Sequence, residues 1–185
     1  MKKHQLTLTV CEGAIFMAAA LVLSYIKIPV GFFFGGFGGS IDFVMVPLIL
    51  YAVRRGAGWG VVAGLLFGTM KFFFAGGTAV SWQSMLLDYS LAYGAVGLAG
   101  LCRGWKRPLT WGAVIGCLGR FGIHYLSGVT IYAQYMPESF MEMTMTTPAL
   151  YSLLYNGSYM SVNTVLAILV CALLEKPMEK FIEEV

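Results

Sequence analysis

Three ionisable side chains interrupt long apolar stretches of this 185-residue sequence: Asp88, Arg120 and His124. Arg120 and His124 share one of these stretches, and Asn156 adds an amide to a third. An ionisable group is costly in hydrocarbon, so within a membrane-spanning helix it usually faces a cavity or a partner. At a rise of about 1.5 Å per residue, counting from the basic residues that flank each stretch places Asp88, His124 and Asn156 at similar depths. A shared polar layer predicts a ligand pocket near one face of the membrane.

Aromatic side chains are expected at the same depth, where a carboxylate beside ring faces favours a flat, cationic or amide-bearing ligand. These aromatic residues are Trp82, Tyr89, Tyr132, Tyr151, Tyr155 and Tyr159. Arg120 and His124 lie four residues apart and share one helix face. A further polar stripe is expected on the last long helix, formed by Ser152, Asn156, Tyr159 and Asn163.

Two other interpretations of these residues stay open. Asp88 and Arg120 could form a buried ion pair while the tyrosines form an interfacial belt. Alternatively, Asp88 and His124 could relay protons, because histidine titrates near neutral pH.

Composition predicts an all-α integral membrane protein. Hydrophobic residues make up 58% of the chain and charged residues 11%, which is too apolar for one soluble core. With about 20 residues per span, residues 1–185 form a single membrane domain, a compact bundle of six transmembrane helices. The expected helices are 7–28, 41–53, 57–75, 83–102, 109–134 and 149–175, the first being a retained span instead of a signal peptide.

Basic residues set the expected topology. Nine of the twelve fall where an even number of crossings separates the groups, so the positive-inside rule places both termini in the cytoplasm: Lys2, Lys3, Arg54, Arg55, Arg103, Lys106, Arg107, Lys176 and Lys180. Lys27 and Lys71 are expected at outer helix ends, where long side chains can reach water. The scattered basic residues do not indicate a nucleic-acid partner.

Small residues predict close packing and a mobile cover. Residues 29–40 are rich in Gly and Phe and form a candidate lid. Glycines recur every four residues over 56–68 and at Gly112 and Gly116, which permits close helix contact. Ala14 and Ala18 form a similar pair, suited either to internal packing or to docking of another membrane protein.

Signatures of enzymes are missing from the sequence. It contains no GxxxxGK[ST], HExxH or GxSxG motif. The four cysteines form no CxxC pair and are expected to be buried packing thiols, so neither a metal nor a cofactor is predicted.

The sequence resembles the thiamine-specific substrate-binding (S) components of bacterial energy-coupling-factor (ECF) vitamin transporters. The matching stretches are Gly38-Gly39-Ser40-Ile41, Pro47, Arg54-Arg55-Gly56, Leu86-Leu87-Asp88-Tyr89, Leu91-Ala92, Arg120 to His124, Ser127-Gly128, Tyr151-Ser152-Leu153, Tyr155-Asn156 and Tyr159-Met160. The resemblance implies six helices around an outward-facing thiamine site, capped by the loop between the first two.

The resemblance also implies roles for individual residues. Ligand-binding positions fall on Asp88, Tyr89, Arg120, His124, Tyr132, Tyr151 and Asn156, with Phe34 or Phe37 as the aromatic residue of the lid. Some family members carry Glu at the position of Asp88 and Trp at that of Tyr132. Ala14 and Ala18 fall on the motif that contacts the transmembrane coupling subunit, which joins two ATPase subunits.

The expected function is therefore high-affinity thiamine binding by a multi-pass protein of the bacterial plasma membrane, with ATP hydrolysis supplied by partner subunits. One rival is an autonomous proton-coupled vitamin carrier. Another is a membrane enzyme or scaffold that uses Asp88 and His124 for chemistry or packing.

Overall fold

The computed structural model describes residues 3–30 and 38–183 and is mostly helical. The long helices are α1 (Lys3–Leu23), α3 (Met45–Arg55), α4 (Ala57–Phe74), α7 (Pro108–Thr130) and α8 (Pro148–Leu174), and a short α9 spans Glu179–Glu183. Between α4 and α7 runs one continuous helical stretch made of α5 (Trp82–Met85), the π-helix η1 (Leu86–Leu91), α6 (Ala92–Val96) and the 3-10 helix η2 (Gly97–Cys102). A second 3-10 helix, η3 (Tyr132–Tyr135), follows α7.

Two short antiparallel strand pairs complete the described residues. β1 (Ile28–Pro29) pairs with β2 (Ser40–Ile41), with Ile28 opposite Ile41. β3 (Ser139–Phe140) pairs with β4 (Met143–Thr144). The first pair holds together the two ends of the segment that contains residues 31–37.

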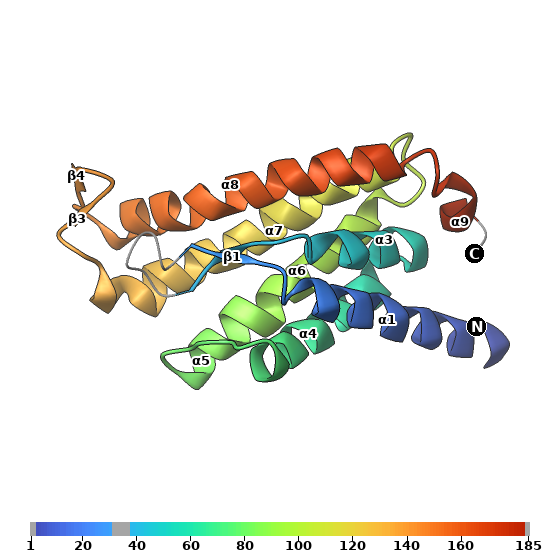
Figure 1. The fold of residues 1–185 in the computed structure, drawn as a ribbon, viewed down its shortest axis with the longest axis horizontal. Coiled ribbons are helices and arrows are strands. Elements are labelled where there is room, and N and C mark those ends of the chain that lie inside the picture. The colour runs from blue at the N-terminus through green and yellow to red at the C-terminus, as the bar shows by residue number, and fades with distance from the viewer. Residues whose placement is uncertain (1–2, 31–37, 184–185) are drawn as a thin grey trace.

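The helices lie side by side in an elongated bundle (Figure 1). Both ends of the chain lie at one end of the bundle, whereas the β3–β4 hairpin and α5 lie at the other. Within residues 3–30 and 38–183, four helical stretches are long and apolar enough to cross a membrane: α1, α4, residues 82–102 and α8. The chain is thus a helical, multi-pass membrane protein.

Several helix ends differ from those predicted. α1 ends at Leu23 instead of 28, because the chain turns into β1 five residues later. The second helix begins at Met45 instead of 41. Just before it, the Asp42 side chain accepts a hydrogen bond from the backbone N–H of Val44 at 3.2 Å. α7 ends at Thr130, where η3 takes over.

The core surrounds α3, in which every residue from Met45 to Arg55 is buried. A short helix that is apolar over most of its circumference is buried from all sides. α1, α4, η2, α7, α8 and α9 all contact it. α3 is therefore the central helix of the bundle.

Glycines on α4 allow the closest helix contact in the core. A Cβ atom at Gly64 or Gly68 would collide with the backbone carbonyl of Tyr93 or Tyr89, respectively. Gly60 faces Gly97 in the same way. The predicted glycine face is confirmed at these positions, but Gly56 lies outside the helix, at φ +90°, as the junction between α3 and α4.

Arg54 and Arg55 are buried, although the sequence placed them in a connecting loop. Both contact Glu12 of α1, with Nη2 of Arg54 2.9 Å from Oε1 and Nε of Arg55 2.6 Å from Oε2. The guanidinium of Arg54 also lies 3.8 Å from the ring centre of Phe181. This cluster joins α1, α3 and the C-terminal segment at the end of the bundle that carries the termini.

Two predictions for small and sulfur-containing residues need correction or refinement. Ala14 and Ala18 are exposed, so they do not pack inside this chain, and Gly13 instead contacts Tyr51 of α3. Cys11 is exposed, unlike the buried Cys102, Cys117 and Cys171, because it lies on the outer side of α1.

Candidate functional site

A cavity of about 570 Å³ is lined by elements that meet at the end of the bundle opposite the termini. Its described walls come from Lys27, β1, residues 38–40, the end of α4 with the loop that follows it, η1, α6, α7, η3 and α8. The lining residues include Asp88, Tyr89, Arg120, His124, Tyr132, Tyr151 and Asn156. The structure thus brings to one cavity all seven described residues that the resemblance implied as ligand-binding positions. Phe34 and Phe37 lie outside the described residues.

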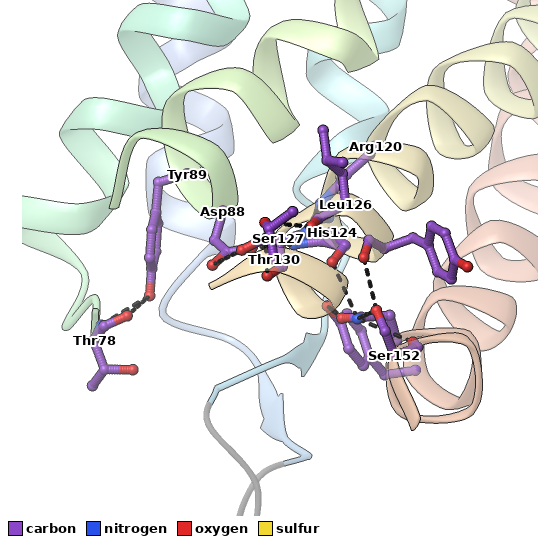
Figure 2. Close-up of polar contacts among 12 residues, drawn as sticks. Thr78, Asp88, Tyr89, Arg120, His124, Leu126, Ser127, Thr130 and Ser152 are labelled. Carbon is purple, nitrogen blue, oxygen red and sulfur yellow. Dashed lines mark hydrogen bonds and ion pairs between the residues drawn. The ribbon is translucent and has the colours of Figure 1, made fainter. Parts of the chain in front are cut away.

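Asp88 lies on η1, and π-helical turns occur frequently at functional sites. Its Oδ1 is 3.0 Å from Nδ1 of His124, and its Oδ2 accepts a hydrogen bond from the hydroxyl of Ser127 at 2.9 Å. Figure 2 shows Asp88 directed toward these α7 side chains. The carboxylate is therefore held against α7 while its edge remains at the cavity.

The tautomer of His124 follows from its two neighbours. Arg120 donates through Nε to Nε2 of His124 at 3.3 Å, and because arginine has only donors, Nε2 must be the acceptor. Nδ1 then carries the proton and donates to Asp88. A neutral imidazole with both nitrogens engaged presents its ring to the cavity.

Arg120 is itself buried, with 4% of its surface exposed. Its guanidinium carbon lies 4.2 Å from the ring centre of Tyr93, a cation–π contact. Within the described part of the chain, no hydrogen-bond acceptor reaches its Nη1, and no ion pair joins Arg120 to Asp88. The alternative of a direct Asp88–Arg120 pair is therefore wrong, because His124 lies between them.

Asn156 of α8 forms the opposite wall. Its Nδ2 donates to the backbone carbonyl of Ser152 at 3.1 Å and to that of His124 at 3.3 Å, and its Oδ1 accepts from the hydroxyl of Tyr159 at 2.9 Å. Ser152 in turn donates to the carbonyl of Tyr125 at 2.9 Å. These bonds fix the orientation of the Asn156 amide and join α8 to α7. Figure 2 shows Ser152 of α8 beside α7.

Tyr89 follows Asp88 but points to a different element. Its hydroxyl accepts from the backbone N–H of Thr78 at 2.8 Å, on the loop after α4, as Figure 2 shows. Its ring packs edge-on against Phe72, with centres 5.1 Å apart. Neighbouring residues of η1 thus connect the cavity to both α7 and α4.

Two described residues of the candidate lid, Gly38 and Gly39, contact the cavity walls directly. The hydroxyl of Tyr155 donates to the carbonyl of Gly38 at 2.8 Å. Gly39 has φ +78°, and a Cβ atom there would lie 3.0 Å from the ring of Tyr159. The chain after residue 37 therefore packs on the tyrosines of α8.

The aromatic wall differs in part from the prediction. Five of the six predicted rings line the cavity, whereas Trp82 does not and is 67% exposed, because it begins α5 at the surface. Tyr93 and Tyr135 line the cavity without having been predicted.

At the mouth of the cavity, desolvation lowers the pKa of the Lys27 ammonium, and the positive charge of Lys71 lowers it further.

Sequence reasoning missed a buried ion pair beside the cavity. Lys71 was expected to reach outer water, but it is 5% exposed and its Nζ lies 2.9 Å from Oδ2 of Asp42. The same Nζ donates to the hydroxyl of Tyr93 at 2.6 Å. The signals in the sequence were an unbalanced lysine near the end of one expected helix and a carboxylate, Asp42, at the start of another.

Asn163, the last member of the predicted polar stripe, belongs to this ion pair's surroundings instead of the cavity wall. Its Oδ1 accepts from the backbone N–H of Asp42 at 2.9 Å, and its Nδ2 donates to the carbonyl of Ser40 at 2.7 Å. The other three members of the stripe, Ser152, Asn156 and Tyr159, line the cavity.

A multi-pass helical bundle with a polar, aromatic-walled cavity at one end defines a membrane protein of the solute-binding type. The family model for the thiamine transporter protein (Thia_YuaJ) matches residues 10–183. The chain belongs to this family, so the resemblance seen in the sequence is confirmed.

Individual relatives agree with this assignment. The thiamine transporter ThiT of Bacillus subtilis is 28% identical over 189 residues, which cover 94% of this chain and 93% of the relative. ThiT of Lacticaseibacillus paracasei is 27% identical over 190 residues, covering 94% and 90%. These relatives are transporters by name and not enzymes.

Solved structures share the fold. ThiT from Listeria monocytogenes superposes with a TM-score of 0.80 at 23% identity, over 96% of this chain and 98% of the other. A structure described as the S component of a bacterial ECF transporter has a TM-score of 0.64 at 19% identity, over 97% and 99%.

Proposed function

We propose that this chain is the thiamine-binding S component of an ECF importer. The observation that carries the proposal is the convergence of Asp88, His124 and Asn156 on one cavity, in a member of the thiamine transporter family. The cavity volume of about 570 Å³ falls within the range of small-molecule sites, about 300–1,000 Å³.

The two rings of thiamine suit different walls of the cavity. The aminopyrimidine offers donors and acceptors to the amide of Asn156 and the hydroxyl of Tyr151. The thiazolium carries a positive charge, which favours the ring faces of Tyr132 and Tyr89 and the neutral imidazole of His124. The Asp88 carboxylate supplies the counter-charge.

In this proposal the helical segments cross the bacterial plasma membrane six times as one domain, with both termini in the cytoplasm. The cavity then opens toward the outer face, where the vitamin arrives. Arg120 completes the inner wall.

Partner subunits supply the energy for transport. The exposed Ala14 and Ala18 on α1 provide a small-residue face that suits docking of a transmembrane coupling subunit. Two ATPase subunits bound to that subunit hydrolyse ATP.

Calorimetric titration of the purified chain with thiamine tests the proposal. A saturable one-to-one reaction at micromolar or lower concentration is expected. A benzylpyridinium ion, which is flat and cationic but lacks the aminopyrimidine edge, serves as the control and should bind far more weakly. A flat titration with thiamine would refute the proposal.

The autonomous proton-coupled carrier is the second candidate, favoured by the contact between Asp88 and His124. The hydrogen-bond chain from Asp88 ends at Arg120, however, which keeps its proton at physiological pH. Liposomes that contain this chain alone should therefore accumulate no thiamine under a pH gradient, and accumulation without ATPases would support the carrier.

A further inference from the structure

The walls of the cavity carry more positive than negative charge. Lys27, Lys71 and Arg120 line it, whereas Asp88 is the single carboxylate among the described lining residues. Lys27 is exposed at the mouth, where water and salt screen its charge. Lys71 and Arg120 are buried, so their charges act at nearly full strength on a ligand. Such a wall would repel a cation unless another group balances it.

Asp42 provides that balance from behind the wall. It is 3% exposed, and its Oδ2 accepts hydrogen bonds from Lys71 at 2.9 Å and from the hydroxyl of Ser40 at 2.8 Å. Its Oδ1 accepts from the backbone N–H of Val44 at 3.2 Å. Three donors stabilise the ionised carboxylate.

A continuous set of contacts connects Asp42 to Asp88, the carboxylate that would face the ligand. Lys71 bonds the hydroxyl of Tyr93, whose ring faces the guanidinium of Arg120. Arg120 donates to His124, and His124 contacts Asp88. Two carboxylates at the ends and two cations between them make the set neutral before any ligand enters.

We propose that Asp42 is a specificity-determining residue for positively charged ligands, because it neutralises Lys71 and so lets the cavity accept a cationic ring beside Asp88. This inference rests on the proposed function. Asp42 does not touch the ligand in this arrangement. It acts through Lys71, and its effect is therefore selective for ligand charge.

Comparison of two ligands separates charge from shape. One is thiamine, and the other is its neutral isostere, in which a carbon replaces the quaternary nitrogen of the thiazolium ring. The measured quantity is the ratio of their dissociation constants, determined by calorimetry on the purified chain.

Replacement of Asp42 by Asn keeps an acceptor for Val44 and removes the charge. Because the buried Lys71 then lacks its counter-charge, the affinity for thiamine is expected to fall by about tenfold relative to the affinity for the isostere. Asp42→Ser, a second neutral variant that can also cap Val44, should shift the ratio in the same direction. Either folded variant is sufficient for the test.

Removal of both charges restores the balance. In the double variant Asp42→Asn/Lys71→Met, the ratio should return to within about threefold of the original value, even if both affinities fall. Lys106→Gln, an exposed charge at the other end of the bundle, is the matched control and should leave the ratio unchanged.

Equal losses of affinity for thiamine and for the isostere in the single variants would overturn the inference. Asp42 would then serve only to hold the neighbouring backbone in place. If the unaltered chain failed to bind thiamine, the proposed function itself would be wrong. Binding by the unaltered chain with an unmoved ratio in the variants would overturn this inference alone.

Discussion

The Asp88 carboxylate faces Nδ1 of His124 at 3.0 Å across 36 residues of sequence. This contact joins η1 to α7 and fixes both side chains at the cavity. Because the other imidazole nitrogen accepts from Arg120, the imidazole is neutral where a cationic ligand would lie. A neutral imidazole beside the Asp88 carboxylate therefore favours a positively charged ligand, as the proposed function requires.

Replacement of Asp88 by Asn should weaken thiamine binding by about a hundredfold, because a charge-assisted contact is lost. Titration calorimetry measures the change. Glu138→Gln removes a carboxylate from an exposed residue near the β3–β4 hairpin and should leave the affinity as it was. Unaltered binding by the Asp88 variant would exclude this carboxylate from the site.

Replacement of Arg120 by Met should release His124 from its single tautomer. The expected readout is a mixture of Nδ1–H and Nε2–H forms in nitrogen NMR of labelled histidine, with about tenfold weaker thiamine binding. Arg103→Met, an exposed arginine at the other end, is the control. Retention of one tautomer in the Arg120 variant would contradict the assignment.

Replacement of Gly64 by Ala should destabilise the bundle. The new methyl would meet the Tyr93 carbonyl, and overpacking costs about 1–3 kcal/mol. Thermal unfolding in detergent should show a lower midpoint. Gly58→Ala lies on the same helix with no heavy atom within 4 Å and should hold or raise the midpoint. Equal midpoints for the two variants would argue against the close contact.

Replacement of Glu12 by Gln should leave Arg54 and Arg55 buried without a carboxylate. Breaking such a cluster costs about 3 kcal/mol, which thermal unfolding would detect. Since the cluster lies at the end opposite the cavity, thiamine affinity of the folded protein should not change. Glu183→Gln, exposed on α9, is the control for lost charge, and a matching loss there would contradict the special role of Glu12.

Replacement of Ala14 or Ala18 by Trp should block docking without affecting the ligand site. Thiamine uptake by cells with the complete transporter should fall strongly, while binding by the isolated chain stays unchanged. Ala19→Trp places the same bulk on another exposed side of α1 and should preserve uptake. Normal uptake with Trp at position 14 and at position 18 would remove this face from the interface.

The sequence alone determined the helical membrane class and predicted the polar layer that lines the cavity. Long apolar stretches have few alternatives to helices in lipid, and polar residues inside them must face a cavity or a partner. Counting residues along each helix at about 1.5 Å per residue predicted similar depths for Asp88, His124 and Asn156. Their presence in one cavity could therefore be predicted.

Only the tertiary structure decided which side chains touch. Depth does not fix the rotation of a helix about its axis, so Asp88 could have met Arg120 and instead meets His124. Lys71 pairs with Asp42, 29 residues away in the sequence, and Arg54 pairs with Glu12, 42 residues away. These pairings depend on how the glycine face of α4 and the buried α3 bring distant segments together, which no local pattern in the sequence specifies.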